Sequence, residues 1–330
     1  MSNIRRTLVK STAAILTVAA LGFLPASIVM AETFPDRPVN VVVAWPAGGG
    51  HDTVGRLLAD YLAEELSQPI VVTNQPGAAG TAGVRAAANA DPDGYTIGVM
   101  GLHVVAQTYM NENAVPFDSI MPLALIEKSP AALSVRTDSG ITDLASFVAA
   151  AKADPNAILN ANDGPGGFAN ITAMLIQKAI GAEFATIPYQ GYAPAVAAIA
   201  SGETNASTVP TALMLGLAGG GDVKIIAIAG EQRHFRAPDV PTFIEGGVPF
   251  VFGDFVGLFL PAGVPADRAA ILEAAVMKVM ANDDFLAAAK TAGLIISPEG
   301  SAAFGAFLTE QDGKVYPVLD ESGLVVANQK

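Results

Sequence analysis

Three consecutive glycines, Gly48, Gly49 and Gly50, separate an apolar run from a segment with helical spacing. A strand-to-helix turn of this kind leaves backbone N–H groups free at the positive end of a helix dipole, where they attract anions. The turn is not a dinucleotide fingerprint, because Thr53 stands at the third glycine's place, and no Gly-Lys-Ser/Thr phosphate loop occurs. Two interpretations stay open: a binding site for a small anion, or a tight connection without a ligand.

Two further loops of small residues precede helix-like segments. One contains Ala79, Gly80 and Thr81, and the other runs through Gly164, Pro165, Gly166 and Gly167. Loops at the carboxyl ends of parallel strands open into a shared crevice. We therefore expect the three loops to surround one anion, with backbone N–H groups and the Thr81 hydroxyl as donors to a carboxylate.

Several side chains next to these loops could contact a ligand or have a structural role. Asp52 could cap the first helix or meet a cationic part of a ligand. His51 and His103 could be donors or packing residues, whereas His234, in a charged segment, is expected to be solvated. Trp45 could form a wall of the crevice or belong to the core, and Tyr189 or Tyr192 could cover a ligand.

The sequence lacks the signatures of common catalytic and metal sites. It has no Gly-x-Ser-x-Gly elbow, no His-Glu-x-x-His, three histidines and no cysteine. The absence of cysteine excludes disulfides and thiolate chemistry. We expect a binding protein without catalytic residues, cofactor or metal; the alternative is an exported hydrolase that uses His51 or His103.

The N-terminal segment has the pattern of an export signal. Arg5, Arg6 and Lys10 precede an uncharged, largely apolar stretch that ends at Val29-Met30-Ala31. We expect a signal peptide over residues 1–31, the alternative being an uncleaved anchor, and a periplasmic protein exported by the Sec or the twin-arginine route. The net charge of −13 makes nucleic acid an improbable partner.

Strand-like and helix-like segments alternate after residue 31, which predicts mostly parallel sheets flanked by helices. Strands are expected at 41–44, 70–73, 95–100 and 158–162, and helices at 83–89, 169–180, 193–200 and after Pro265. Because no low-complexity linker separates the halves, we expect two discontinuous domains that two strands connect.

Eight segments, in their order and spacing, resemble one family over essentially the whole chain after residue 31. They are Phe34–Val39, Trp45–Asp52, Gln68–Gly77, Asp91–Tyr95, Gly164–Gly166, Ile187–Gly191, Pro238–Thr242 and Gly257–Gly263. Together they resemble the Bug-type solute-binding proteins of tripartite tricarboxylate transporters.

The resemblance implies a two-domain, Venus-flytrap (type II) periplasmic binding protein with a ligand between its domains. Domain I would comprise residues 32–130 and 253–330, and domain II residues 131–252, with crossing strands near 126–135 and 254–260. The implied ligand is a small organic carboxylate, and the implied partners are the membrane permease subunits of such a transporter; a monomer is expected. Besides the loop residues above, we expect ligand contacts from Ala47, Gly191, Thr208 and Asp254.

Departures from the family pattern leave the ligand open. His51 stands where threonine is common, Ala47 replaces a frequent proline, and Gln75 replaces a usual cation. The loop 163–168 lacks the family's serine and threonine, so Thr208 could supply a hydroxyl instead. A dicarboxylate, a tricarboxylate, an aromatic acid and an acidic amino acid all fit, and an amino acid would require Asp52 to be free for its ammonium group. A sensor module that presents its ligand to a receptor kinase remains an alternative.

Overall fold

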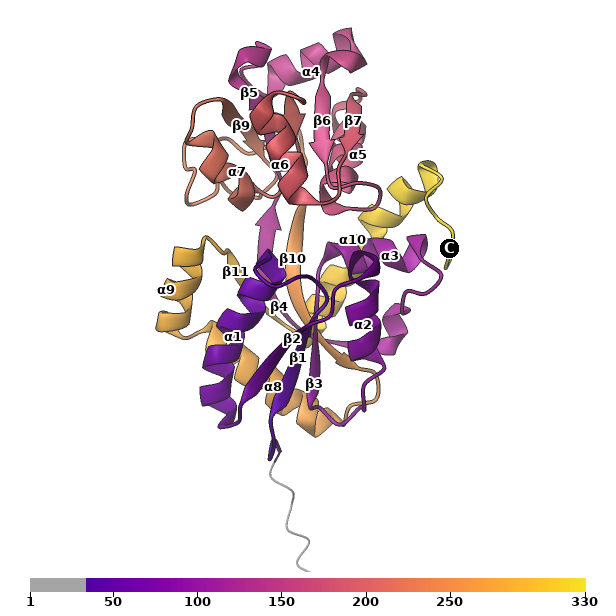
Figure 1. Ribbon diagram of the computed structural model, residues 1–330, viewed down its shortest axis with the longest axis vertical. Coiled ribbons are helices and arrows are strands. Elements are labelled where there is room, and N and C mark those ends of the chain that lie inside the picture. The colour runs from indigo at the N-terminus through magenta and orange to yellow at the C-terminus, as the bar shows by residue number, and fades with distance from the viewer. Residues whose placement is uncertain (1–33) are drawn as a thin grey trace, which may run out of the picture. The chain divides into compact units, whose positions relative to one another are not determined.

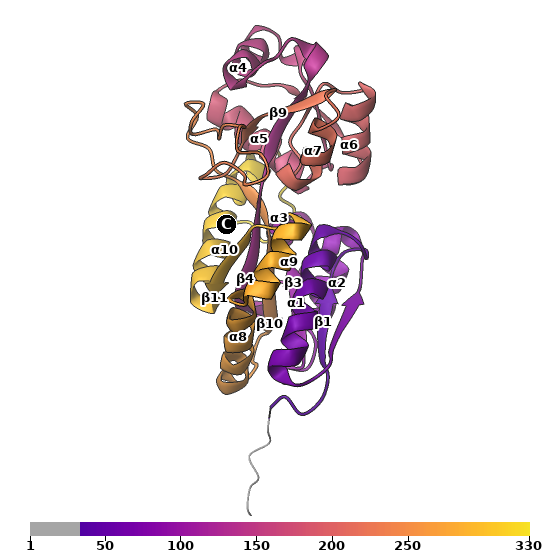
Figure 2. The same ribbon diagram turned by 90° about the vertical axis from the view of Figure 1, so that its left-hand side faces the viewer.

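The computed structural model describes residues 34–330 (Figures 1 and 2). The expected signal peptide, residues 1–31, lies outside the described residues. Pro35–Lys330 forms one compact unit that contains two β-sheets, each covered by helices. Among the described helices, none is long and apolar enough to cross a membrane.

The first sheet has six strands in the order β11-β4-β10-β3-β1-β2. Strand β1 pairs in parallel with β2 and β3, whereas β10 and β11 add antiparallel pairs. The strands are β1 Val39–Val43, β2 Ile70–Asn74, β3 Thr96–Met100, β4 Ile120–Pro130, β10 Gly253–Pro261 and β11 Ile296–Gly300.

Helices cover both faces of this sheet. Helix α1 packs against α8 and α9, and α3 packs against α10 on the other side (Figure 1). The helices are α1 Gly50–Leu66, α2 Thr81–Ala88, α3 Leu102–Met110, α8 Ala266–Met280, α9 Asp283–Ala292 and α10 Ser301–Glu321. Pro265 precedes α8, as its sequence position predicts.

The second sheet has five strands in the order β7-β6-β8-β5-β9. Its strands are β5 Ala132–Arg136, β6 Leu159–Asn162, β7 Ala185–Pro188, β8 Ala206–Ser207 and β9 Val223–Ile228. Helices α6 and α7 pack against each other over a hydrophobic cluster that also includes Ala169 of α5, whereas the other buried apolar residues of α4 and α5 belong to a second cluster. The helices are α4 Leu144–Ala153, α5 Phe168–Ile180, α6 Tyr192–Ser201 and α7 Thr211–Ala218.

Two strands connect the sheets, which confirms the expected two-domain α/β architecture. Strand β4 of the first sheet is followed, after Ala131, by β5 of the second, and β10 returns beside β4 in antiparallel pairing. Both sheets are therefore mixed, because the crossing strands and their neighbours run against the parallel strands. The alternating pattern predicts the parallel strands and gives no direction for the crossing strands.

One side-chain expectation is wrong. His234 is buried, with 3% of its surface exposed, although its charged neighbours indicated a solvated residue. Its ring stacks on Phe235 at 4.8 Å, and its Nδ1 accepts the Arg236 N–H. The charges at Arg233 and Glu245 instead pair with each other at the surface.

Close packing of aromatic rings over glycines holds the first sheet together beside the crossing strands. Gly98 on β3 lies opposite Phe259 on β10, and a Cβ at Gly98 would lie 2.1 Å from the Phe259 ring. A Cβ at Gly257 would likewise lie 2.1 Å from the ring of Phe304 on α10. The two glycines leave room for the rings, so a methyl group at either position would force the core to shift.

A Gly98→Ala substitution should therefore destabilise the protein by about 1–3 kcal/mol or more through overpacking. The matched control is Gly313→Ala on α10, where a Cβ meets no atom within 4 Å and alanine should be neutral or stabilising. Chemical denaturation measures both. Equal stability of the two variants would contradict the packing described here.

Candidate functional site

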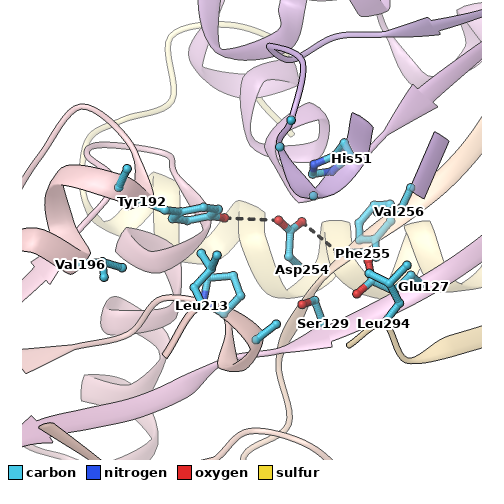
Figure 3. A pocket seen from close by; sticks show the side chains of 16 residues that line it. His51, Glu127, Ser129, Tyr192, Val196, Leu213, Asp254, Phe255, Val256 and Leu294 are labelled. Atoms are coloured by element: carbon cyan, nitrogen blue, oxygen red, sulfur yellow. Dashed lines mark hydrogen bonds between the residues drawn. The ribbon is translucent and has the colours of Figure 1, made fainter. Parts of the chain in front are cut away.

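A cavity of about 510 Å³ lies between the amino ends of α1 and α6, with the crossing strands β4 and β10 as its floor (Figure 3). Its walls are mostly apolar, and its polar groups come from few side chains. The lining residues are Gly48, Gly49, Gly50, His51, Glu127, Ser129, Tyr192, Ala193, Val196, Pro210, Ala212, Leu213, Asp254, Phe255, Val256 and Leu294. An apolar cavity with a few convergent polar groups is typical of a small-molecule site.

The glycine turn supplies one end of the cavity. Gly48 has φ +84°, a conformation that favours glycine, and Gly49 is the N-cap of α1. Neither Gly50 nor His51 donates its backbone N–H to a described acceptor. These N–H groups, at the positive end of a 17-residue helix, can hold a carboxylate.

Asp52 fixes this turn and is not free for a ligand. Its carboxylate accepts the Gly48 N–H at 2.8 Å, Arg56 Nε at 3.0 Å and Asn74 Nδ2 at 2.8 Å. Burial opposes the charge, but these hydrogen bonds outweigh it and lower the pKa of Asp52. Asp52 thus has a structural role but does not cap the helix, because Gly49 is the N-cap and no side chain makes a cap hydrogen bond. The condition for an ammonium contact at Asp52 is not met.

Aromatic side chains support the turn from behind. Trp45 stacks on His51 with a ring distance of 3.9 Å, and a Cβ at Gly80 would lie 3.1 Å from Trp45. A Cβ at Gly101 would lie 2.2 Å from His51 Nε2, so only glycine leaves room for this ring position. Burial is the main cause that lowers the pKa of His51, so the ring is neutral at physiological pH.

Asp254 occupies the N-terminus of α3. Its Oδ1 accepts the Leu102 N–H at 3.1 Å and the Phe255 N–H at 2.9 Å, and its Oδ2 accepts the Tyr192 hydroxyl at 3.3 Å. Burial, together with Asp254, raises the pKa of Tyr192, so the phenol keeps its proton. Tyr192 belongs to α6 and Asp254 to β10, so this bond joins a helix beside the second sheet to a strand of the first.

Asp163 has the same relation to α5. Its Oδ1 accepts the Asn170 N–H in the first turn, and its Oδ2 lies 3.5 Å from His103 Nε2. Burial opposes protonation of His103, but Asp163 and Asp254 outweigh it and raise the pKa of His103. His103 thus pairs with a carboxylate from the other sheet.

The third glycine loop has no free N–H group. Gly164 donates to Asn162, Gly166 to Asn170 and Gly167 to the Gly164 carbonyl, while Pro165 has no N–H. This loop is therefore closed by its own hydrogen bonds, and it does not line the cavity.

The structure brings only part of the predicted site together. Gly48, Gly49, His51 and Asp254 line the cavity. Gly191 is the N-cap of α6 beside it, and Trp45, Gly80 and His103 pack behind the lining. Residues that lie away from the lining are Ala47, Asp52, Thr81, Gly164, Pro165, Gly166, Gly167, Tyr189 and Thr208, and the expectation for Ala79 stays untested.

Two of these outlying hydroxyls have structural partners. Thr208 is fully buried, donates to the Ala169 carbonyl at 2.7 Å and accepts from Asn160 at 3.1 Å. The Thr81 hydroxyl accepts from Asn111 at 3.4 Å. The remaining predicted donors therefore come from the α1 turn.

Sequence reasoning missed the polar floor. Glu127 and Ser129 lie on β4, two residues apart, and Tyr192 was named only as an optional cover. The polar segment Glu127-Lys128-Ser129, near the end of an otherwise apolar crossing strand, was the signal that could have found Glu127 and Ser129. Among the described residues, no cluster of three acidic, histidine or cysteine side chains could hold a metal ion.

The His103–Asp163 pair makes stability depend on pH. The pKa of His103 is raised in the folded protein, so its stabilising contribution is fully present below the unfolded-state pKa and is lost as pH rises through the folded-state value. His103→Gln should reduce the free energy of unfolding more at about pH 5.5 than at about pH 8.5. Denaturation at both pH values tests this, and an equal reduction would contradict the ion pair.

Comparison with known proteins identifies the family. A model of the tripartite tricarboxylate transporter family receptor matches residues 54–324. Protein BugT of Bordetella pertussis is 30% identical over 240 residues, which cover 71% of this chain and 74% of the relative.

Solved structures agree with this family. A TctC solute-binding protein from Polaromonas has a TM-score of 0.77 and 29% identity, and the match covers 88% of this chain and all of the other. MatC from Rhodopseudomonas palustris, solved with bound malate, has a TM-score of 0.74 and 29% identity over 87% of this chain and all of the other. The chain therefore belongs to the tripartite tricarboxylate transporter receptor family of periplasmic solute-binding proteins.

Proposed function

We propose that this protein captures a small organic carboxylate in the periplasm and delivers it to the membrane permease of a tripartite tricarboxylate transporter. The observation that carries the proposal is the pair of free N–H groups of Gly50 and His51, which open from a helix N-terminus into a largely apolar cavity. The expected export signal, residues 1–31, would bring the chain to the periplasm.

The distribution of carboxylates around the cavity indicates where the ligand's anion binds. Asp254 already occupies the amino end of α3, and Asp163 that of α5. At α1 and α6, the N–H groups of Gly50, His51, Tyr192 and Ala193 donate to no described acceptor. A ligand carboxylate placed between these two helices would complete the pattern of one anion at each helix end.

The cavity also explains how a ligand would close the protein. Its walls come from α1 on the first sheet and from α6 and α7 on the second. A ligand that contacts both walls binds the closed state more tightly than the open state, and this difference drives closure. We propose residues 32–130 with 253–330, and residues 131–252, as the two domains that move.

The hydrolase alternative has little support in this geometry. Ser129 is the single serine, threonine or cysteine among the described lining residues, and no hydrogen bond joins it to His51. A nucleophile needs an adjacent base that activates it. Supporting the receptor instead, MatC, a family relative of 29% identity, holds malate, which is a carboxylate.

A Gly49→Leu substitution should abolish carboxylate binding while the protein stays folded. Gly49 lines the cavity at φ −79°, and a Cβ there meets only the Pro46 carbonyl at 3.5 Å, so leucine fits the backbone and fills the site. The measurement is the thermal shift of the protein with a panel of small carboxylates, where a ligand at 100 times its Kd stabilises by about 2.7 kcal/mol. Gly313→Leu on the exposed side of α10 is the control.

Two results would contradict the proposal. One is unchanged carboxylate affinity in the Gly49→Leu variant, which would exclude the α1 turn as the binding site. The other is that no carboxylate of the panel binds, while the purified protein releases on denaturation a compound without an acid group.

A further inference from the structure

The pairing of the crossing strands places two carboxyl groups side by side on the cavity floor. Asp254 of β10 lies opposite Ser129 of β4, and Val256 lies opposite Glu127. Directly opposed residues of an antiparallel pair share a face, and side chains two residues apart share it too. All four residues line the cavity, and Figure 3 shows Glu127, Ser129 and Asp254 on this floor.

Glu127 has no hydrogen-bonding or charged partner among residues 34–330. Its surface is 6% exposed, and its carboxyl group makes no hydrogen bond or ion pair with any described residue. Burial, and next the charge of Asp254, raise the pKa of Glu127 to about 8. A buried carboxyl group without a partner is costly for the folded state, so its presence on a cavity wall points to a partner that arrives with the ligand.

No cationic side chain of the described lining neutralises the floor. The titratable groups that face Glu127 across the cavity are Asp254 from β10, Tyr192 from α6 and His51 from α1. Lys128, the neighbour of Glu127, points to the opposite face, where it pairs with Glu299 of β11 at 2.6 Å. The imidazole of His103, whose pKa Asp254 helps to raise, packs behind this lining, so a cation that pairs with the ionised form of Glu127 would come from the ligand.

We propose that Glu127 and Asp254 form a cation-binding subsite, and that the carboxylate ligand also carries a basic nitrogen in its ammonium form. This inference rests on the proposed carboxylate-binding function. The carboxylate lies at the amino ends of α1 and α6, and the ammonium group donates to Glu127, Asp254 and the Ser129 hydroxyl. The apolar part of the ligand packs against Val196, Leu213, Val256 and Leu294.

The free protein supplies an independent readout of this subsite. Because the pKa of Glu127 is raised above its unfolded value, the group lowers stability increasingly as pH rises from about 4.5 to 8. Glu127→Gln should therefore raise the stability of the ligand-free protein at pH 8 and have little effect near pH 4. A stabilising change that also removes ligand binding identifies a binding residue and excludes a purely structural one.

The decisive experiment compares matched ligands that differ only in the amino group. The probes are L-leucine against 4-methylpentanoate, 5-aminopentanoate against pentanoate, and L-glutamate against glutarate, titrated calorimetrically into the mature full-length protein. We expect an aminated probe to bind at least about 10-fold more tightly than its partner, because a hydrogen-bonded charge pair in a dry cavity is among the stronger contacts.

Variants assign the effect to the floor. Glu127→Gln should lower the affinity for the aminated probe about 10- to 100-fold and leave the weak binding of its deaminated partner unchanged. The control is Glu299→Gln, the same change on the opposite face of the neighbouring strand, which should change neither affinity.

The pH dependence of the affinity shows whether Glu127 acts as a carboxylate toward the ligand. An ammonium group requires Glu127 to be ionised, so binding releases a proton, and the affinity for the aminated probe should rise up to about 10-fold per pH unit from pH 6 to 8. In Glu127→Gln the affinity should be flat over this range.

The outcomes separate this inference from the proposed function. Tighter binding of the deaminated acids, with affinity that falls as pH approaches 8, overturns the cation subsite while the carboxylate receptor stands; Glu127 then donates its proton to a ligand carboxylate. Equal affinity within every pair, or no effect of Glu127→Gln, also overturns it. If none of the six acids binds, both the inference and the proposed small-carboxylate function fail.

Discussion

The antiparallel pairing of β4 with β10 is the constraint on which the site depends. These two strands carry the chain between the sheets, so they necessarily lie at the bottom of whatever space the helices α1 and α6 enclose. Their register, Asp254 opposite Ser129 and Val256 opposite Glu127, decides which side chains face that space. A slip of one residue in β4 would turn Lys128 toward the cavity in place of Glu127 and Ser129, and so replace an acidic side chain on the floor with a basic one.

The same floor also joins groups of the two sheets. Asp254 accepts the Leu102 N–H of α3 and the Tyr192 hydroxyl of α6, so one carboxylate contacts the first residues of both helices. His103 and Asp163 form a second contact between the sheets. These two interactions join groups of the two sheets, and a ligand that contacts both walls would add to them.

Much of the architecture was predictable, because several strands and helix starts are encoded in local sequence. The apolar run at β1 and the glycine turn after it fix a buried strand and a helix start from local sequence alone, and Pro265 does the same for α8. The two crossing strands were expected from the family resemblance. The antiparallel direction of β10 was not readable, because it depends on long-range pairing that leaves no local signal.

The candidate site was only partly predictable, because glycine loops look alike in sequence. The α1 turn keeps its N–H groups free, whereas the loop at Gly164–Gly167 bonds to Asn162 and Asn170 and is closed. Which loop is closed depends on Asx side chains whose orientation is a tertiary property. Glu127 was missed because the sequence does not show which strand pairs with β4. Without that pairing, an acidic residue in this strand cannot be assigned to the cavity floor.

The net charge of −13 and a carboxylate ligand are compatible. Salt screens the distant surface charges beyond about 8–10 Å, so the groups within the cavity decide affinity. There the helix dipoles of α1 and α6 attract an anion, whereas Asp254 on the floor repels one, and Glu127, with its pKa raised to about 8, adds its charge only as pH rises toward that value. A cavity with opposite preferences at its two ends selects against a molecule with acid groups at both ends and favours one whose charges differ. Specificity would then come from the penalty on the wrong ligand as much as from attraction to the right one.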